Sequence, residues 1–213
     1  MEPLDDTLWF PEPNAEELVA VGGDLSIERL LLAYRSGIFP WSANPITWWS
    51  PDPRAVFELD KFHIPRRLSK TMRSGKFTFT KNKAFTEVIA ACAERPRDED
   101  TWIESEFISA YTRLHQAGHS HSVECWLDGK LAGGIYGIST GGLFAGESMF
   151  HRVTDAGKAA LCHLADHLKQ RGHQLFDIQM LTPVTEQFGA IEIPREEYFE
   201  RLATATEVKC TFG

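Results

Sequence analysis

The chain has 213 residues, of which 43% are hydrophobic and 24% are charged, a globular composition that excludes wholesale disorder. This length allows one large domain, or an ordinary domain with a small second one. The 22 Lys and Arg residues against 30 Asp and Glu give a net charge of −8, which excludes a protein coated in nucleic acid but allows a local basic patch.

The N-terminal sequence and the cysteines bear on location. The first residues are acidic and lack the apolar segment of a secretion signal, and no apolar run is long enough to span a membrane. Four cysteines are present, none in a C-x-x-C pair: Cys92, Cys125, Cys162 and Cys210. This spacing argues against a zinc site and against a disulfide framework. We therefore expect a reduced cytoplasmic protein without a membrane segment or a bound metal.

The first part of the chain is rich in proline and predicts a loop-rich segment with one helix. Ser26 is a good N-cap for that helix, and Gly37 can end it. We expect a small N-terminal domain over residues 1–60 and a second domain over residues 61–213.

A basic segment over residues 61–83 contains eight of the 22 Lys and Arg residues and no Asp or Glu. Pro65 and Gly75 bracket a predicted short helix within it. Arg66, Lys70 and Arg73 share one face of that helix, and the same basic segment contains Lys61 and Arg67. Such a run is often only a solvated surface, but in an acidic chain it also suits contacts to phosphates.

The rest of the sequence alternates helices and strands. The expected order is a strand (77–80), two helices (84–94, 104–116), three strands (122–127, 130–138, 143–150), a helix (155–170), a strand (175–180), a helix (196–203) and a terminal strand (208–212). This order predicts an α+β fold with a mixed sheet of the acetyltransferase (GNAT) type. Two central strands of that architecture separate to admit an acyl donor, an analogy that assigns no function by itself.

Three polar residues lie in otherwise apolar strands: Glu147, Asp177 and Gln179. Side chains alternate along a strand, so Asp177 and Gln179 are expected on one side, and Glu147 is expected to share a side with Met149. A buried carboxylate costs several kcal/mol unless it is paired or lines a wet cleft. These residues therefore lie on an outward face, bond to backbone, or form a site of acid–base chemistry.

Apolar residues around these strands also allow two interpretations. The predicted helix 155–170 and its neighbouring strands contribute Ile135, Phe144, Met149, Leu161, Leu164 and Leu168. They form either ordinary core or a pocket for an aliphatic or aromatic side chain. Likewise, Trp48 and Trp49 either fill the core or stack on an unpaired base.

Several motifs occur in the order and spacing of a known family. They are GGDLS at 22–26, GIFPW at 37–41, WWSPDPR at 48–54, GESMF at 146–150, DIQ at 177–179, GA at 189–190 and IPR at 193–195. The chain thereby resembles bacterial leucyl/phenylalanyl-tRNA–protein transferase over about residues 8–200. The tryptophan-proline block and the GESMF block are highly specific.

The resemblance implies a small N-terminal domain, an acetyltransferase-like C-terminal domain and a reaction. The family moves Leu or Phe, and less well Met, from charged tRNA to the N-terminal Arg or Lys of a protein, which marks that protein for degradation. No cofactor is expected, because the aminoacyl ester is already activated. The α-amino group, with a pKa near ~7.7–8.0, must lose a proton before it attacks the ester.

The resemblance also implies roles for individual residues. Asp177 would orient Gln179, whose carbonyl would accept a hydrogen bond from the incoming amine, while Glu147 would hold a substrate ammonium. The final proton acceptor stays open between water, Asp177 and a tRNA hydroxyl. The six apolar residues match the family's side-chain pocket. The residues expected at the terminal adenosine and the tRNA phosphates are Trp48, Trp49, Trp102 and Tyr111, with Lys61, Arg66, Arg67, Lys70 and Arg73.

Four positions depart from the family pattern: Ser42, His151, Gly157 and Val184. They put acceptor recognition and the relative use of Leu and Phe in question. Two other classes of protein also stay open. An acyl-CoA acetyltransferase would need a pyrophosphate-binding turn that residues 150–158 do not form. A non-catalytic binding module would not need a carboxylate and an amide on one strand face.

Overall fold

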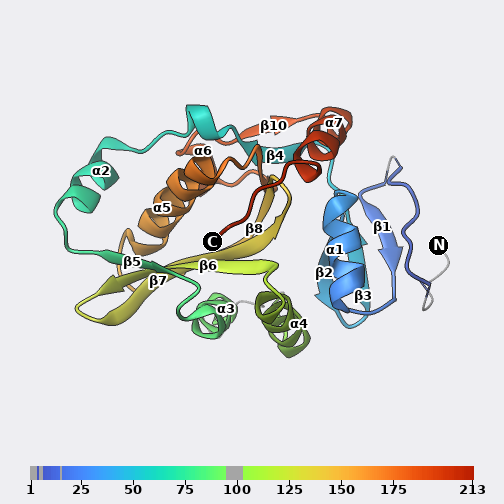
Figure 1. Cartoon of the computed structure of the whole chain (residues 1–213), viewed down its shortest axis with the longest axis horizontal. Helices are drawn as coiled ribbons and strands as arrows, with labels where there is room; N and C mark the ends of the chain where they lie inside the picture. The colour runs from blue at the N-terminus through green and yellow to red at the C-terminus, as the bar shows by residue number, and fades with distance from the viewer. Residues whose placement is uncertain (1–3, 5–6, 15, 95–102) are drawn as a thin grey trace.

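The computed structural model describes residues 4, 7–14, 16–94 and 103–213. A small sheet near the N-terminus lies beside a large curved sheet covered by helices (Figure 1). The predicted α+β class, with a small N-terminal region and a mixed sheet, is confirmed.

The small sheet has three antiparallel strands and one helix. The strands are β1 (Leu18–Val21), β2 (Phe39–Ala43) and β3 (Ile46–Trp49), in the order β1-β3-β2. Helix α1 (Ile27–Arg35) begins as predicted, because the Ser26 hydroxyl accepts the backbone N–H of Arg29. It ends just before Gly37, whose φ of 72° favours glycine and whose missing Cβ lets the Phe199 ring approach.

The large sheet runs in the order β10-β4-β9-β8-β7-β6-β5 over the described residues. Its strands are β4 (Arg54–Phe57), β5 (Thr78–Lys81), β6 (Ser120–Leu127), β7 (Lys130–Thr140), β8 (Leu143–His151), β9 (Leu175–Gln179) and β10 (Ile191–Ile193). Neighbours are antiparallel except β8 and β9, which are parallel. The β6–β7 hairpin turns at Asp128 and Gly129, both with positive φ, as the sequence predicts.

The parallel pair β8–β9 separates soon after it begins. The two strands pair only over Leu143–Ala145 and Leu175–Asp177, although β8 continues to His151. Beyond that point Glu147 and Gln179 face each other across an opening. This is the strand separation that the sequence predicts for an acetyltransferase-like sheet.

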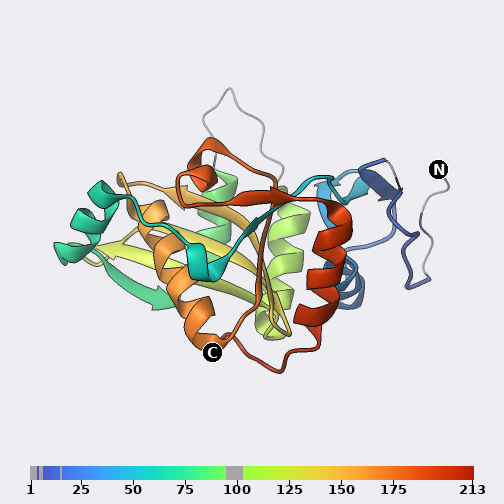
Figure 2. The ribbon, with the colours of Figure 1, turned by 90° about the horizontal axis from the view of Figure 1, so that it is seen from above.

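Helices cover both faces of the large sheet (Figures 1 and 2). Helices α3 (Phe85–Ala93) and α4 (Ser105–Gln116) lie on one face, and α5 (Ala156–Arg171) lies on the other. Each face has its own buried apolar cluster, and the cluster on the α3–α4 face continues into the small sheet through Leu30 and Trp48. A shared core thus holds the small sheet against the large one. The remaining helices are η1 (Leu59–Lys61), α2 (Arg66–Arg73), α6 (Pro183–Glu186) and α7 (Arg195–Thr206).

The expectation of a loop-rich segment with one helix over residues 1–60 missed four short strands. Besides α1, this range contains β1, β2, β3 and β4, each only four or five residues long. Strands this short show too little alternation to be distinguished from loops between prolines. The last of them, β4, lies within the predicted first domain but pairs in the large sheet.

The terminal strand expected at residues 208–212 is also absent from the described fold. The tail is held by side-chain packing instead. The Phe212 ring stacks on His121 and on Phe144, with ring centroids 4.3 and 5.6 Å away. The apolar signal in this segment therefore reflects an anchor and not sheet pairing.

Candidate active site

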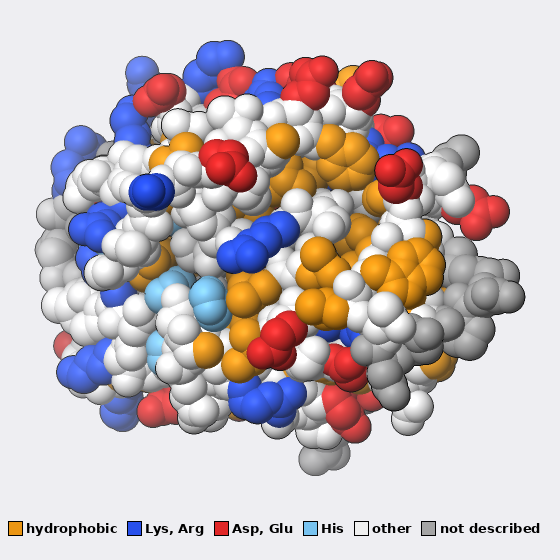
Figure 3. Space-filling view, turned by 45° about the vertical axis from the view of Figure 1, so that its right-hand side comes forward, with side chains coloured by type: hydrophobic (Ala, Val, Ile, Leu, Met, Phe, Trp, Pro, Cys, Tyr) orange, Lys and Arg blue, Asp and Glu red, His pale blue; other side chains and the backbone are white. Residues whose placement is uncertain are grey.

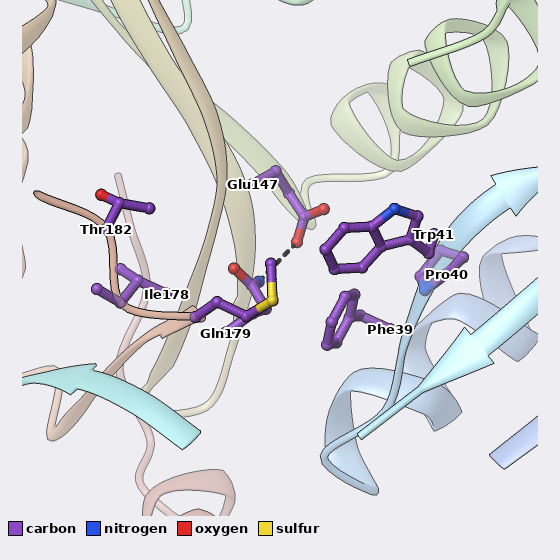
Figure 4. Close-up of a pocket in the computed structure, with 8 residues that line it drawn as sticks. Phe39, Pro40, Trp41, Glu147, Ile178, Gln179 and Thr182 are labelled. Carbon is purple, nitrogen blue, oxygen red and sulfur yellow. Dashed lines mark hydrogen bonds between the residues drawn. The ribbon is translucent and has the colours of Figure 1, made fainter. Parts of the chain in front are cut away.

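A cavity of about 170 Å³ opens where β8 and β9 separate, between the large sheet and the small one (Figure 4). Strand β2 contributes Phe39, Pro40 and Trp41, β8 contributes Glu147, and the end of β9 with the following loop supplies Ile178, Gln179, Met180 and Thr182. Apolar walls thus surround a carboxylate and an amide, which is the pattern of a ligand-binding site.

Glu147 enters the cavity from a β-bulge. Gly146 and Ser148 pair with consecutive residues of β7, so Glu147 is the extra residue in the ladder. Bulges re-aim side chains and concentrate next to active sites. Glu147 bonds to side chains of the α3–α4 face, whereas Met149 packs on the α5 face. The expectation that these two residues share a side is therefore wrong, because the bulge interrupts the alternation.

Three side chains hold the Glu147 carboxylate. The Tyr34 hydroxyl donates to Oε1 over 2.8 Å, the Tyr111 hydroxyl donates to Oε2 over 3.1 Å, and the Gln179 amide donates to Oε1 over 3.3 Å. Burial raises the pKa of Glu147 to about 7, even though the two tyrosine hydroxyls act to lower it. A carboxyl group that titrates near neutral pH suits proton transfer.

Asp177 lies behind the cavity and is enclosed by protein. It is 1% exposed, and it forms an ion pair with Arg54 through two hydrogen bonds of 2.8 and 2.7 Å. Its Oδ2 accepts the Tyr198 hydroxyl and its Oδ1 accepts the backbone N–H of Gln179, each over 2.9 Å. Together these bonds occupy the four lone-pair sites of the carboxylate. Asp177 is therefore fully engaged by protein groups, and one of its bonds fixes the backbone of Gln179.

Gln179 ends β9 in a strained backbone conformation. Its φ of 58° lies in the left-handed region, which costs a non-glycine residue ~1–2 kcal/mol. Because its Nε2 donates to Glu147, its Oε1 is left facing away from that carboxylate (Figure 4). Asp177 and Gln179 lie on one side of the sheet as predicted, since the intervening Ile178 and the preceding Phe176 pack on the opposite, α5 side.

The apolar residues predicted to form a side-chain pocket lie together under α5. Ile135, Phe144, Leu161, Leu164 and Leu168 are buried in one cluster, and Met149 packs against it. Met149 also lines a second cavity of about 660 Å³ between α3, the end of β8 and the start of α5. His151, Gly157 and Val184 line the same cavity, while Ser42 bonds within the small sheet. The assignment of these residues to a side-chain pocket stays a prediction.

The aromatic residues predicted at the nucleotide differ in exposure. Trp48 is fully buried and its indole N–H donates to the Gly22 carbonyl, and Tyr111 is buried beside Glu147. The structure therefore places both rings in the core and not on a surface where a base could stack. Trp49 is half-buried, with its ring centroid 6.3 Å from that of Trp41. Trp102 lies outside the described residues.

The basic face predicted for residues 61–83 is present. Arg66, Arg67, Lys70 and Arg73 are exposed on α2, which Leu68 anchors to the core. Lys61 is exposed as well, and its ammonium contacts Glu58. The predicted helix between Pro65 and Gly75 is confirmed.

Sequence reasoning missed the partners of the acidic residues. The α1 pattern predicts Tyr34 only as core packing, and no motif marks Tyr198. Arg54 and Trp41 fall within recognised motifs without an assigned role. Tyr34 and Glu147 are 113 residues apart, and Arg54 and Asp177 are 123 apart, so no local signal links them.

In the part of the chain that the structure describes, no group of three His, Cys, Asp or Glu side chains is placed to hold a metal ion. No helix among these residues is long and apolar enough to cross a membrane. None of the four cysteines forms a disulfide among the described residues.

Known proteins resemble the chain in sequence and in fold. A family model described as leucyl/phenylalanyl-tRNA protein transferase matches residues 56–203, and the model of that family's N-terminal domain matches residues 23–52. The leucyl/phenylalanyl-tRNA–protein transferase of Tolumonas auensis is 50% identical over 96% of this chain and 91% of its own length. The enzyme of the same name from Solidesulfovibrio magneticus is 49% identical over 99% of this chain and 88% of its own length.

Similar solved structures are more distant. L-PGS from Bacillus licheniformis has a TM-score of 0.43 and 14% identity, covering 78% of this chain and 54% of its own. A GCN5-related N-acetyltransferase from Kribbella flavida has a TM-score of 0.41 and 10% identity, covering 76% and 59%.

The split mixed sheet, the polar cluster at its opening and the sequence matches define an enzyme of the transferase class. The chain belongs to the leucyl/phenylalanyl-tRNA–protein transferase family.

Proposed function

We propose that the protein moves Leu or Phe, and less well Met, from aminoacyl-tRNA to the N-terminal Arg or Lys of acceptor proteins in the cytoplasm, marking them for degradation. The observation that carries this proposal is the Glu147–Gln179 pair, joined over 3.3 Å at the opening between β8 and β9. A carboxylate and a free amide oxygen beside apolar walls suit an amine that must lose a proton next to an apolar side chain.

The chemistry joins an amine to an ester that is already activated. The acceptor's α-nitrogen forms a C–N bond to the ester carbonyl carbon, and the C–O bond to the tRNA ribose breaks. Glu147 binds the incoming ammonium and takes its proton, because a pKa of about 7 is close to that of an α-amine at ~7.7–8.0. The ribose oxygen leaves with the second proton of the nitrogen, and Glu147 returns the first proton to water, so each transfer releases one proton.

Gln179 and Asp177 divide the positioning of the amine. The Gln179 Oε1 accepts the second N–H of the attacking amine and aims its lone pair at the carbonyl carbon. Asp177 acts through the backbone, since it holds the Gln179 N–H over 2.9 Å and so stabilises the left-handed conformation. Fixing two bound substrates in this way accounts for much of the acceleration.

The apolar cluster under α5 selects the amino acid that is transferred from the tRNA. Hydrophobic contacts discriminate by only ~1–3 kcal/mol per methylene, which suits an enzyme that accepts Leu, Phe and Met together. Met149, between this cluster and the 660 Å³ cavity, can adapt to side chains of different shape.

A transfer assay tests the proposal. Label is followed from leucyl-, phenylalanyl- and methionyl-tRNA to peptides that begin with Arg, Lys or Ala. Transfer to the Arg and Lys peptides only, with Leu and Phe ahead of Met, is the expected result. Transfer of label from acetyl-CoA instead would identify an acetyltransferase. The absence of transfer from any donor would favour a non-catalytic binding module.

Two variants of Gln179 distinguish the effect of its side-chain amide on the transfer rate from the effect of its backbone strain on stability. Both Gln179→Ala and Gln179→Gly are expected to lower the transfer rate by roughly 10²-fold, because both remove the group that aims the amine. Gln179→Gly should also raise the stability by about 1 kcal/mol, since glycine adopts a positive φ without strain. Steady-state kinetics and thermal melts measure the two effects. Near-normal turnover in both variants would contradict the role given to the amide.

The basic face of α2 predicts a salt dependence. Lys and Arg side chains are denser on the left-hand side of Figure 3, and Asp and Glu lie more toward the top and right. Affinity for tRNA should fall steeply with salt, and the triple variant Arg66→Gln, Lys70→Gln, Arg73→Gln should flatten the log–log slope by about 2–3. Fluorescence anisotropy with labelled tRNA at several salt concentrations measures this slope. An unaltered slope would remove this face from the tRNA site.

A further inference from the structure

A separate hollow of about 370 Å³ lies between α2 and the start of α5. It is lined by Pro65, Arg67, Leu68, Thr154, Asp155, Lys158 and Gln187. Three of these, Thr154, Asp155 and Lys158, also line the 660 Å³ cavity, which reaches Met149 on β8. The two spaces therefore adjoin and lead from the basic helix toward the strand that carries Glu147.

Two cations from different elements face this hollow. Arg67 of α2 and Lys158 of α5 form no ion pair among the described residues. Lys158 is also half-buried, although most lysines are exposed. The carboxylate that lines the hollow belongs to Asp155, whose Oδ2 accepts the Thr71 hydroxyl over 3.4 Å. The lining thus carries more positive than negative charge, which favours an anion.

The start of α5 adds to this positive charge. Asp155 precedes the helix with a φ of 71° and makes no capping bond from its side chain. The first turn contains no acidic residue but does contain Lys158. A cation at the positive end of a helix is unfavourable, so an anion bound in the hollow would offset both charges.

We infer that Arg67 and Lys158 bind a backbone phosphate of the single-stranded 3′ end of the tRNA and lead its last nucleotides along β8. This inference rests on the proposed function. A strand advances ~3.3 Å per residue, so the end of β8 at His151 lies about 13 Å from Glu147, a span that a tRNA 3′ end covers. Contacts to phosphate carry no sequence information, which suits an enzyme that accepts tRNAs for more than one amino acid.

Two donors that differ in phosphates test the inference on the full chain. One is 3′-phenylalanyl-adenosine, which has no phosphate, and the other is phenylalanyl-CCA, which has the phosphates of the 3′ end. We expect Lys158→Gln to raise KM for the CCA donor about 5- to 10-fold more than KM for the adenosine donor. Arg67→Gln should act in the same direction, and Lys158→Arg should restore most of the loss because it keeps the charge. Lys209, an exposed lysine that does not line the hollow, provides a control, and Lys209→Gln should behave as wild type with both donors.

The outcomes separate this inference from the proposed function. Equal losses on both donors would show that Lys158 acts on the catalytic site or on folding, and would overturn the phosphate site. No loss on either donor would overturn it as well. Failure of the wild type to transfer phenylalanine from either donor, with tRNA binding intact, would instead count against the proposed function. In that case the salt slope of CCA binding still tests the site, and Lys158→Gln should lower that slope by about 0.7.

Discussion

Replacing Glu147 by Gln is expected to lower the transfer rate by about 10²–10⁴-fold, the usual contribution of a positioned acid–base group. Glutamine keeps the size of the side chain and can still bond to Tyr34 and Tyr111. It cannot take up the proton of the incoming ammonium. Single-turnover kinetics with leucyl-tRNA and an Arg peptide measure the loss, and a variant within threefold of wild type would contradict the assignment.

The same substitution should change the pH profile. Glu147 must be a carboxylate to accept a proton, and burial raises its pKa to about 7, so wild-type activity should fall as the pH drops through about 7. The α-amine of the acceptor adds a second rise to the pH profile, at its own pKa of ~7.7–8.0. Glu147→Gln should retain only the limb that belongs to the amine. A profile with the lower limb intact would assign that limb to another group.

Stability provides an independent check on the environment of Glu147. The pKa of Glu147 is raised from 4.5 to about 7 in the folded protein. The contribution of this group to the free energy of unfolding is therefore fully present below about pH 4.5 and is lost as the pH rises through about 7. Glu147→Gln removes the charge that is costly to bury. The stability of the variant minus that of wild type should therefore be larger at pH 8 than at pH 5.5. Urea denaturation of both proteins at both pH values measures this difference.

Breaking the Arg54–Asp177 ion pair is expected to have the largest effect on folding. Both side chains are 1% exposed, and Arg54 also donates to the Gly37 carbonyl over 3.1 Å. Arg54→Ala leaves a buried carboxylate without its counterion, which costs roughly 3–5 kcal/mol and lowers Tm by roughly 6–20 °C in a chain of this size. Thermal and urea melts measure this loss.

A double variant separates stability from activity. Replacing both partners by apolar residues, Arg54→Met with Asp177→Leu, should recover much of the stability, because no unpaired charge remains. Activity should stay low, since Gln179 loses the acceptor for its backbone N–H. A double variant as unstable as Arg54→Ala would show that the pair itself is needed to fold. Full activity in the double variant would contradict the positioning role of Asp177.

Much of the fold could be predicted because the signals were local. Ser26 and Gly37 bound α1, Pro65 and Gly75 bound α2, and Asp128 with Gly129 makes the β6–β7 turn. Each of these depends on the conformational preference of one residue or on a hydrogen bond to a near neighbour. The short strands of the small sheet could not be predicted, because strands of four or five residues are defined by their pairing partners.

In the candidate site, too, some features could be predicted from the sequence and others could not. A carboxylate and an amide in an apolar strand predict that Asp177 and Gln179 share one side of the sheet, and they do. The exposure of each group could not be predicted. Asp177 is enclosed by Arg54 and Tyr198, and Trp48 is buried, although nothing in their own sequence neighbourhoods distinguishes them from exposed residues.

The sequence by itself determined the class of fold, most helix ends and the polar residues that interrupt apolar strands. Each of these follows from the chemistry of residues a few positions apart. Only the tertiary structure decided the surroundings of each carboxylate. A bulge directs Glu147 into the cavity, where burial raises the pKa of its carboxyl group to about 7. Asp177 is instead paired with an arginine 123 residues away in the sequence. Burial and ion pairing depend on segments that meet only when the chain folds, and these contacts set the energy of a charge.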